Sequence, residues 1–383
     1  MKNKKKIFFW SPILGNVGTI KATINSLESI HDNSINEIFI LNIFGEFSFY
    51  KNESLRIKKI NFFTFLRFFP STGLLAKFLI YLFSFLSLPF LFFYVAKYKP
   101  NIIYASLVGY LPLLLKIFFK DLKIFNSIQG YPRFTKVRKF IWKKFYKKSD
   151  LIITMTENTK NKLINDIGNF KEIKKICNPV IDDDLYKLSQ EKIPTQFENI
   201  ISKKIQFISI GRLTRQKNYI ELLKSLNILK NKLGENFYEN NINVIILGTG
   251  EDLKMLNKFT EDNKLNNIHF LGFQKNPFNF LKSSNFYVST SLWEDPGHTL
   301  IEAASLNIPI ITSDCPSGPK ELFNENNSYT YQSGNIDDLS KTLLKIVNDS
   351  AKKEINLEKI SKAKELSENF TKDRFYNSIK DYI

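Results

Sequence analysis

The chain has 383 residues, enough for two or three domains, and this length excludes a small disulfide-stabilised scaffold. Hydrophobic residues make up 43% and charged residues 24%, which excludes a disordered or collagen-like polymer and predicts a globular protein. Cys177 and Cys315 lie far apart without a CxxC or Cys/His ligand spacing, and there are three His. We therefore expect no zinc site or multi-His metal centre, and the cysteine usage fits a reducing compartment.

The net charge of +18 is unevenly distributed along the chain. Residues 1–185 hold 29 basic and 13 acidic side chains, whereas residues 186–383 hold 26 and 24. An overall bias toward lysine does not explain this asymmetry. A basic first half indicates a polyanionic partner, which could be nucleic acid, an anionic membrane surface or a phosphorylated substrate. Because no helix-turn-helix, zinc-finger or RNP signature is present, we expect no nucleic-acid partner.

The first half alternates short apolar runs with helical patterns, which is the rhythm of βαβ units. The first run follows a basic N-terminus that resembles a signal peptide, but Pro12 and Gly15 interrupt it and no small-residue cleavage site follows. We interpret it as a buried strand. The predicted strands of this half are Ile7–Trp10, Glu37–Ile43, Ile57–Phe63, Asn101–Ala105, Lys123–Ile128 and Leu151–Met155.

Two segments of the first half indicate a membrane surface. Phe78–Ala96 has nineteen residues without a charge, and residues 60–98 carry fourteen aromatics. This segment fits a buried core helix best, then an interfacial anchor, and least well a true membrane span. Residues 133–148 contain eight Lys/Arg and no acid, with aromatic residues between them. A basic helix of this kind is often simply solvated, but two such segments in one half favour a membrane surface.

The strand rhythm restarts after residues 180–203, which we interpret as a linker entered through the acidic turn Asp182–Asp184. The predicted strands of the second half are Lys204–Ile210, Asn243–Leu247, Ile268–Leu271, Phe286–Ser289 and Ile308–Ser313. Unbroken apolar runs are typical of parallel strands covered by helices on both faces. The sequence therefore predicts an α/β protein with two separate sheets, followed by a charged helical tail over Leu357–Ile383.

Three glycine-containing turns follow predicted strands and could bind phosphate, since ligands of open α/β sheets bind at the carboxyl ends of the strands. The first, residues 11–18, is a weak signal that a plain tight turn explains as well. The second, residues 211–218, precedes a predicted helix over Tyr219–Leu229, and its Arg212 and Lys217 could bind a diphosphate together. An ordinary basic loop without a binding role would have a similar composition.

The third turn, residues 291–303, places two carboxylates around a helix start. Glu294 precedes the helix and Glu302 lies about one turn inside it, so both could face the same crevice. Carboxylates suit polyol recognition because each accepts two hydrogen bonds at once. Taken alone, Glu302 could equally be an acid favoured there by the helix dipole.

The order and spacing of motifs over about 203–323 decide between these interpretations. They comprise Gly211-Arg212-Leu213 with Gln216-Lys217-Asn218, Leu247-Gly248-Thr249-Gly250-Glu251, Leu271-Gly272-Phe273, Glu294 and Glu302 with seven residues between them, and Pro309 to Glu321 with its Asp314 and Gly318. Together they resemble glycosyltransferase family 4, the retaining nucleotide-sugar enzymes of the GT-B fold (glycosyl transferases group 1). The resemblance implies two Rossmann-like doubly wound domains facing a central cleft. The first half resembles the family only in outline, through the Gly15 turn, Lys99–Ile103 and Ser149–Ile152.

The resemblance also implies residue roles. Arg212 and Lys217 would hold the donor diphosphate and stabilise charge on the leaving nucleotide without a metal or cofactor, and Glu294 would hold the transferred sugar. Glu302 would bind the ribose. Gly272 and Phe273 would face the nucleobase, and the amides of Gly297, His298 and Thr299 would meet the sugar or phosphate. The remaining donor-binding positions are Gly15 and Gly211.

Two positions depart from the family pattern. The usual Glu-Gly-Phe-Gly reads Glu294-Asp295-Pro296-Gly297, which stiffens the turn and could alter donor preference. Many relatives carry a histidine after the fifth strand of the first domain, where this chain has Gln129. Glutamine cannot act as a base, so a proton would leave through the phosphate or water.

We therefore expect a hexosyl- or N-acetylhexosaminyl-transferase that uses a UDP-sugar, or a GDP-sugar, and a lipid-linked or cell-envelope glycan acceptor. Residues 1–185, with a helix over about 365–383, would bind the acceptor, and residues 186–364 the donor. The basic half fits a polyprenyl-diphosphate-linked acceptor at the inner face of the cytoplasmic membrane. Alternatives are a non-catalytic glycan- or membrane-binding relative and a nucleotide-sugar epimerase of the same fold.

Overall fold

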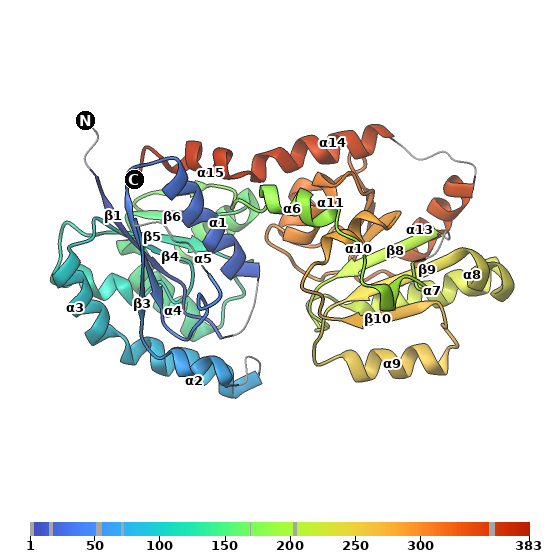
Figure 1. Ribbon diagram of the computed structural model, residues 1–383, viewed down its shortest axis with the longest axis horizontal. Coiled ribbons are helices and arrows are strands. Elements are labelled where there is room, and N and C mark those ends of the chain that lie inside the picture. The colour runs from blue at the N-terminus through green and yellow to red at the C-terminus, as the bar shows by residue number, and fades with distance from the viewer. Residues whose placement is uncertain are drawn as a thin grey trace. The chain divides into compact units, whose positions relative to one another are not determined.

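A computed structural model describes residues 4–14, 18–50, 56–69, 73–168, 170–201, 205–351 and 357–383. The chain divides into two compact units, one formed by Met1–Val180 with Phe370–Ile383 and the other by Ile181–Asn369. Each unit contains one parallel sheet with helices packed against it (Figure 1). The predicted turn at Gly15 lies outside the described residues.

The first unit is built on a seven-stranded sheet with the order β3-β2-β1-β4-β5-β6-β7, in which every pair of neighbours is parallel. Its strands are β1 (Lys6–Trp10), β2 (Glu37–Asn42), β3 (Ile57–Asn61), β4 (Ile102–Ala105), β5 (Lys123–Ile128), β6 (Leu151–Thr154) and β7 (Ile173–Lys175). The order 3-2-1-4-5-6 is that of the Rossmann fold. The six predicted strands are all present, and the short edge strand β7 is an addition that the sequence did not indicate.

Alternate residues of β1 point to opposite faces of this sheet, as strand geometry requires. Ile7 and Phe9 pack with α1 (Gly18–Asp32) and α15 (Lys372–Ile379) on one face. Phe8 and Trp10 pack on the other face with α2 (Gly73–Leu86), α3 (Leu88–Tyr98), α4 (Lys136–Phe145) and α5 (Glu157–Ile167). The aromatic helices and the basic helix α4 therefore cover the same face of the sheet (Figure 1).

The apolar segment predicted over Phe78–Ala96 forms two helices, α2 and α3, that meet at Ser87. No single described helix is long and apolar enough to cross a membrane, whereas these two helices pass that test as a pair bent by 43°. Leu91 and Val95 of α3 are buried against the sheet, but Phe78 and Phe93 are more than half exposed. The helix pair therefore belongs to the core on one side only, and its outer side is apolar and uncovered.

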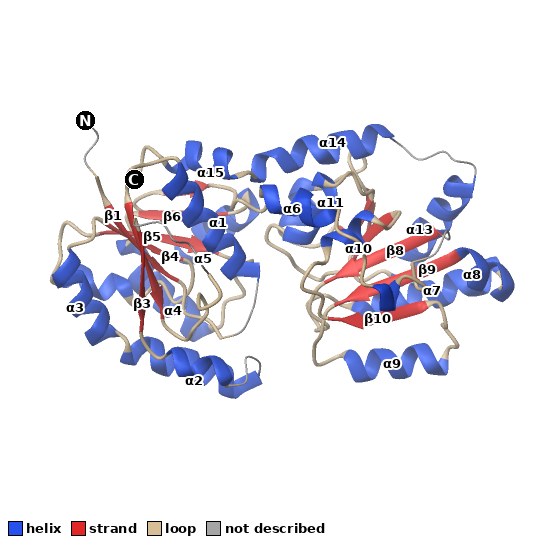
Figure 2. Cartoon of the chain, viewed as in Figure 1, coloured by secondary structure: helices blue, strands red, loops and turns tan. Residues whose placement is uncertain are grey.

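The second unit contains a six-stranded parallel sheet with the order β10-β9-β8-β11-β12-β13, again a Rossmann order (Figure 2). Its strands are β8 (Ile205–Ile210), β9 (Ile242–Leu247), β10 (Ile268–Gly272), β11 (Phe286–Ser289), β12 (Ile310–Ser313) and β13 (Tyr329–Tyr331). The helices are α6 (Asp183–Ser189), α7 (Tyr219–Leu233), α8 (Glu235–Asn241), α9 (Leu253–Asp262), α10 (Phe278–Lys282), α11 (His298–Ser305), α12 (Gly318–Leu322), α13 (Ile336–Ala351) and α14 (Leu357–Ser367). All five strands predicted here are present, and β13 was missed.

Two segments connect the units, and both differ in detail from the sequence expectation. The segment expected as a linker begins with helix α6, which packs on α10 of the second unit. Asp182 caps this helix, since its Oδ1 accepts a hydrogen bond from the Leu185 amide at 2.9 Å. At the C-terminus, α14 packs on α11 of the second unit, whereas α15 packs on α1 of the first. The Val180 amide donates to the Phe370 carbonyl at 2.8 Å, so the two connecting segments are paired where they enter the first unit.

Candidate functional site

The candidate residues of the second unit lie at the ends of strands β8, β10 and β11, on the loops that follow them and on helix α11 after β11. Because all strands of the sheet are parallel, these loops emerge at the same edge. The loop after β8 carries Arg212 and Lys217, and the loop after β11 carries Glu294 before α11 begins at His298. The carboxyl edge of this sheet therefore gathers residues that are far apart in the sequence.

The central contact of the site joins Lys217 to Glu294, which are 77 residues apart. Lys217 Nζ lies 2.5 Å from Glu294 Oε1, and the two side chains are only 19% and 11% exposed. Ser291 Oγ donates a second hydrogen bond to the same oxygen at 2.7 Å. The carboxylate is therefore held by a charged donor and a neutral donor in a largely water-excluded position, where both contacts are strengthened.

The two loops that carry this pair are also joined through their backbones. Thr290 Oγ1 donates to the Lys217 carbonyl at 2.9 Å, and Gln216 Nε2 donates to the Trp293 carbonyl at 3.0 Å. The Leu292 amide completes the connection by donating to the Gln216 carbonyl at 2.8 Å. The positions of Lys217 and Glu294 thus follow from hydrogen bonds between the loops as well as from their own ion pair.

The backbone around Glu294 is fixed by the turn after β12. The Glu294 amide donates to the Pro316 carbonyl at 2.8 Å, and its own carbonyl accepts from the amides of Ser317 and Gly318 at 2.8 and 3.0 Å. A Cβ at Gly318 would lie 2.0 Å from the Pro296 carbonyl oxygen, so only glycine allows this approach. The Pro-Ser-Gly sequence downstream therefore supports the Glu294 loop directly.

Glycines on the neighbouring loops serve the same purpose. A Cβ at Gly248 would lie 1.9 Å from the Gly211 carbonyl oxygen, and one at Gly250 would lie 2.1 Å from the Leu213 carbonyl oxygen. A Cβ at Gly211 would meet Lys217 Cε at 2.9 Å. The glycines identified in the sequence thus bring the loops after β8 and β9 into backbone contact and leave room for the Lys217 side chain.

Glu302 lies in α11, downstream of its N-cap residue Gly297, which has a φ of 97°. Glu302 is buried. Burial raises the pKa of Tyr287 well above its usual value, and the nearby groups Tyr219, Glu294 and Glu302 add to this effect. Tyr287 donates a hydrogen bond to Thr299 Oγ1 at 2.6 Å, which ties β11 to the first turn of α11.

The negative field of Glu294 reaches other buried groups as well. Burial raises the pKa of Tyr219, and the Glu294 charge adds to the effect. Burial likewise raises the pKa of the Cys315 thiol to about 12, again with a contribution from Glu294. These raised pKa values keep the Tyr219 hydroxyl and the Cys315 thiol neutral near pH 7.

The other predicted donor residues occupy more open positions. Arg212 is exposed and, among the described residues, makes no hydrogen bond or ion pair. Gly272 ends β10 with a φ of 68°, its carbonyl accepts from the Gly248 amide at 2.8 Å, and Phe273 beside it is 66% exposed. His298 and Thr299 form the first turn of α11, where backbone amides lack partners within the helix.

Sequence reasoning missed several residues that hold the site together, namely Ser291, Thr290, Tyr287 and Tyr219. Serine, threonine and tyrosine are common in such loops and strands, so no local signal distinguishes them. Within the described residues, no group of three or more His, Cys, Asp or Glu is arranged to hold a metal ion.

The first unit presents a neutral polar cluster at the carboxyl edge of its own sheet. Gln129, which follows β5, accepts a hydrogen bond from Asn178 Nδ2 at 2.6 Å and donates from Nε2 to Ser127 Oγ at 2.7 Å. Ser106, which follows β4, accepts from Thr23 Oγ1 at 3.1 Å. This cluster offers hydroxyl and amide groups rather than a titrating base.

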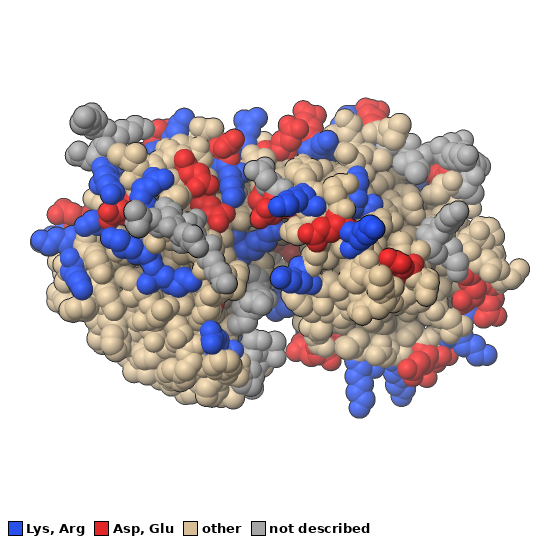
Figure 3. All heavy atoms as spheres, in the orientation of Figure 1, with Lys and Arg blue, Asp and Glu red and all other residues tan. Residues whose placement is uncertain are grey.

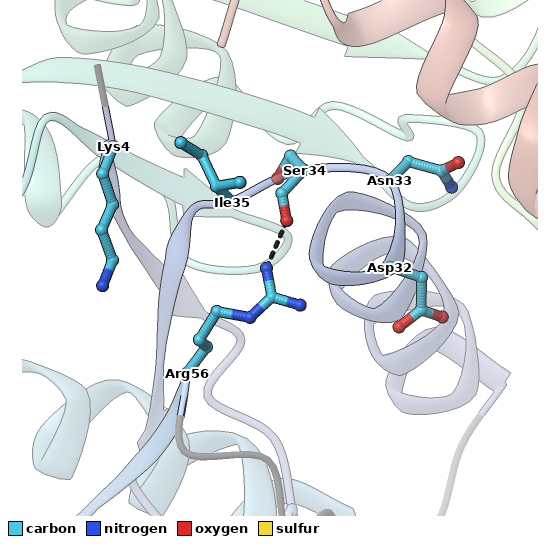
Figure 4. A pocket seen from close by; sticks show the side chains of 6 residues that line it. All are labelled: Lys4, Asp32, Asn33, Ser34, Ile35 and Arg56. Carbon is cyan, nitrogen blue, oxygen red and sulfur yellow. Dashed lines mark hydrogen bonds between the residues drawn. The ribbon is translucent and has the colours of Figure 1, made fainter. Parts of the chain in front are cut away.

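A hollow at the opposite edge of that sheet contains none of the predicted site residues. It is lined by residues that precede β1, β2 and β3 and by the end of α1, namely Lys4, Asp32, Asn33, Ser34, Ile35 and Arg56 (Figure 4). The Arg56 guanidinium donates to the Ser34 carbonyl there. Since ligands of such sheets bind at the carboxyl edge, we regard this hollow as a surface feature.

Comparison with known proteins shows which family the second unit resembles. Residues 191–367 match the family described as glycosyl transferases group 1. This segment of the chain is similar to that family. It includes the whole six-stranded sheet and every candidate residue from Gly211 to Glu302.

Several glycosyltransferases are similar to this chain in sequence. An uncharacterized glycosyltransferase of Methanocaldococcus jannaschii is 41% identical over 204 residues, which are 51% of this chain and 48% of that protein. A Campylobacter jejuni N-acetylgalactosamine-N,N'-diacetylbacillosaminyl-diphospho-undecaprenol 4-alpha-N-acetylgalactosaminyltransferase is 26% identical over 269 residues, 63% of this chain and 66% of that protein. The chain thus spans about half the length of the first relative and 66% of the second.

Solved glycosyltransferase structures share the fold of the whole chain. Anabaena HepE, crystallised with UDP, superimposes with a TM-score of 0.75 at 15% identity, covering 99% of this chain and 100% of that one. The GT-B fold expected from the sequence, with two Rossmann-like units, is therefore confirmed.

Proposed function

We propose that this protein is a retaining glycosyltransferase that moves a sugar from a nucleotide sugar to a lipid-linked or cell-envelope glycan. The observation that carries the proposal is the Lys217–Glu294 ion pair of 2.5 Å at the carboxyl edge of the second sheet. It brings a cation and a polyol-binding carboxylate side by side, the two groups that a diphosphate-linked sugar requires.

Each charged group of the site has a role in this proposal. Lys217 and the exposed Arg212 bind the diphosphate, Arg212 through its fork of donors and Lys217 as a point charge. Glu294 accepts hydrogen bonds from the hydroxyls of the transferred sugar, and Glu302 accepts those of the ribose. Amides at Gly297, His298 and Thr299 begin α11, where the helix dipole favours an anion. Gly272 and Phe273 contact the nucleobase.

Catalysis in this site is positioning together with charge stabilisation. As the bond between the sugar and the diphosphate breaks, the pair of electrons moves to the phosphate oxygen, and Arg212 and Lys217 stabilise the charge that develops there. The acceptor hydroxyl attacks on the face that the nucleotide leaves, so the anomeric configuration is retained. Gln129 cannot take the proton of the acceptor hydroxyl, so this proton passes to the departing phosphate or to water.

The choice of substrates draws support from relatives. HepE was crystallised with UDP, which favours a UDP-sugar over a GDP-sugar as the donor here. The Campylobacter relative is named for an undecaprenol-diphosphate-linked acceptor, which supports a polyprenyl-linked or similar envelope glycan for the acceptor. We propose that the transferred unit is a hexose or an N-acetylhexosamine. The basic first half favours the inner face of the cytoplasmic membrane as the location of this reaction.

The test is a binding screen on the purified full chain by ligand-detected NMR, with a mixed pool of UDP- and GDP-sugars. We expect one nucleotide sugar to bind, its binding to be lost in Arg212→Ala and kept in Arg215→Ala. Arg215 is the matched control, since it is an exposed arginine of the same loop. Absence of binding to any sugar in the pool would favour a non-catalytic relative. Conversion of the bound UDP-sugar without an acceptor would indicate an epimerase.

A further inference from the structure

The first unit carries a large uncovered aromatic surface on the face of its sheet that α2, α3, α4 and α5 cover. Six phenylalanines that are 56–77% exposed define this aromatic patch: Phe65, Phe68, Phe78, Phe85, Phe93 and Phe118. They come from α2, α3 and the 3-10 helix η1 (Thr64–Phe68), and from the residue that follows the 3-10 helix η2 (Pro112–Ile117). Folded proteins rarely expose contiguous apolar patches of more than a few hundred Å², and larger ones mark binding surfaces.

Ring contacts join the elements of the aromatic patch into one surface. Phe63 and Phe65 lie 5.2 and 6.4 Å from the ring of Phe83 in α2, which connects η1 to that helix. Phe92 of α3 lies 5.4 Å from Phe118. An apolar groove runs beside this contact, between the α2–α3 bend and η2, and includes Phe85 and Phe118 in its walls.

Helices α2 and α3 of the patch pack against the protein core with one side and are apolar and exposed on the other. Ala76 and Leu79 of α2, and Leu91 and Val95 of α3, are buried against the seven-stranded sheet. A membrane-spanning helix would expose apolar side chains around its whole circumference. A helix pair with one side packed on a sheet and the other side aromatic is suited to lying in the plane of the interface, where aromatic rings are favoured.

The segment of the chain that carries the patch is strongly basic. Residues 54–149 contain 18 Lys and Arg but one acidic residue, Asp121. Arg67 lies over the ring of Phe68 at 4.6 Å, and Lys97 lies over that of Phe93 at 5.9 Å. In the space-filling view, the surface around α2 is largely free of charged side chains, and lysines and arginines gather farther along the same unit (Figure 3).

Helix α4 extends this basic rim on the same face of the sheet. Lys136, Phe140 and Lys143 are exposed and follow one another at helical spacing, so they line one side of α4. The ring of Tyr110 lies 6.4 Å from Phe145 at the end of α4. Burial, with a smaller contribution from Tyr81 of α2, raises the pKa of Tyr110 to about 12.

We propose that the aromatic patch and the lysines of α4 together dock the protein on an anionic lipid bilayer. The rings enter the boundary between headgroups and acyl chains, and the lysines bind lipid phosphates. A second copy of the chain fits this surface less well, because a symmetric pair would bring two basic rims together and lysine is depleted in protein interfaces.

This inference extends the proposed function by naming the surface that would bring the enzyme to a lipid-linked acceptor. It depends on that function only for its biological purpose. Binding to vesicles is measured without donor or acceptor, and nucleotide-sugar binding is measured without vesicles. Failure of one experiment therefore leaves the other proposal intact.

The test is flotation of the full chain with vesicles of phosphatidylcholine alone or mixed with phosphatidylglycerol, at low and high salt. We expect the double variant Phe78→Ser/Phe85→Ser to bind both kinds of vesicle about a hundred-fold more weakly, since burying each ring contributes a factor of about ten or more. The matched control is Phe237→Ser in α8 of the second unit, an exposed phenylalanine outside the patch, which should bind as the parent does.

The lysines are expected to act differently from the rings. Lys136→Gln/Lys143→Gln should weaken binding to anionic vesicles at low salt by about twenty-five-fold, at roughly a factor of five per lysine, with little effect on neutral vesicles or at high salt. Lys254→Gln/Lys258→Gln on α9 is the matched control. All variants change exposed side chains, and retained circular dichroism and nucleotide-sugar binding would show that they are folded.

Three results would overturn the proposal. The first is absence of vesicle binding by the parent chain, and the second is equal binding by the aromatic variant and its control. The third is concentration-dependent self-association in sedimentation velocity that Phe78→Ser/Phe85→Ser abolishes, which would identify the patch as an interface between two copies.

Discussion

Replacing Glu294 by glutamine should have opposite effects on two ligands of the candidate site. In the free protein, Lys217 Nζ and Glu294 Oε1 lie 2.5 Å apart in a position where both side chains are largely buried. A nucleoside diphosphate must therefore compete with Glu294 for Lys217. Once the carboxylate is gone, Lys217 is left without its charged partner and is free to bind the diphosphate.

The magnitude follows from the burial of the pair. Removing one partner of a fully buried ion pair costs about 3–5 kcal/mol, and the residual exposure of 19% and 11% lowers our expectation to about 2 kcal/mol. The free energy of unfolding of Glu294→Gln should fall by that amount. UDP should regain it on binding Lys217, so its affinity should rise by up to about thirty-fold.

The contribution of the sugar moiety to affinity should fall in the same variant. A hydrogen bond to a charged acceptor contributes about 1.5–3 kcal/mol, so the preference for UDP-sugar over UDP should fall by about ten- to a hundred-fold in Glu294→Gln. Isothermal titration of both ligands gives the two numbers. Glu261→Gln, an exposed glutamate of α9, is the control that should change neither.

Comparison with Lys217→Gln decides whether the reasoning is correct. That variant should lose affinity for UDP and for UDP-sugar alike, because both ligands contain the diphosphate. If Glu294→Gln weakened UDP binding as strongly as Lys217→Gln does, Glu294 would serve only to orient the lysine. The competition that we infer from the ion pair would then be wrong.

Three further predictions concern the packing and titration of buried groups. Gly248→Ala should lower the free energy of unfolding by about 2–4 kcal/mol and abolish nucleotide binding, because its Cβ would lie 1.9 Å from a carbonyl oxygen. The control is Gly334→Ala, which is also at positive φ but in open space and should lower the free energy of unfolding by only about 1 kcal/mol. Thermal or denaturant unfolding measures both values. Burial raises the pKa of Glu46 from 4.5 to about 8, so its contribution to stability should be full below about pH 4.5 and be lost as the pH rises to about 8. Glu46→Gln should flatten the dependence of the free energy of unfolding on pH across this range. An unchanged dependence would refute the assignment. In the native protein, thiol reagents should modify the partly exposed Cys177 first and reach Cys315 only on unfolding, because burial raises the pKa of the Cys315 thiol to about 12; equal rates in a thiol titration would contradict this.

The sequence alone was sufficient to predict the two parallel sheets and to predict that the site lies at the carboxyl edge of the second one. Strands covered on both faces appear as unbroken apolar runs, and such runs are a local property of the chain. The spacing of Glu294 and Glu302 around a helix start is local as well. The glycine at position 248 was recognised through a family motif, whereas the reason for it, the approach of the Gly211 carbonyl oxygen, is a tertiary contact. Edge strands β7 and β13 were missed because three residues are too few to establish a period.

The tertiary structure decided which of these residues meet. Lys217 and Glu294 are 77 positions apart, and their contact depends on the order of parallel strands β8 and β11 in the sheet and on the hydrogen bonds between their loops. Ser291 acquires its role only through that contact. The apolar segment over Phe78–Ala96 likewise contained no information on which of its rings would be covered, because its aromatic residues lie on all sides of the helices. Packing of α2 and α3 on one face of the sheet buried Leu91 and left the aromatic patch exposed.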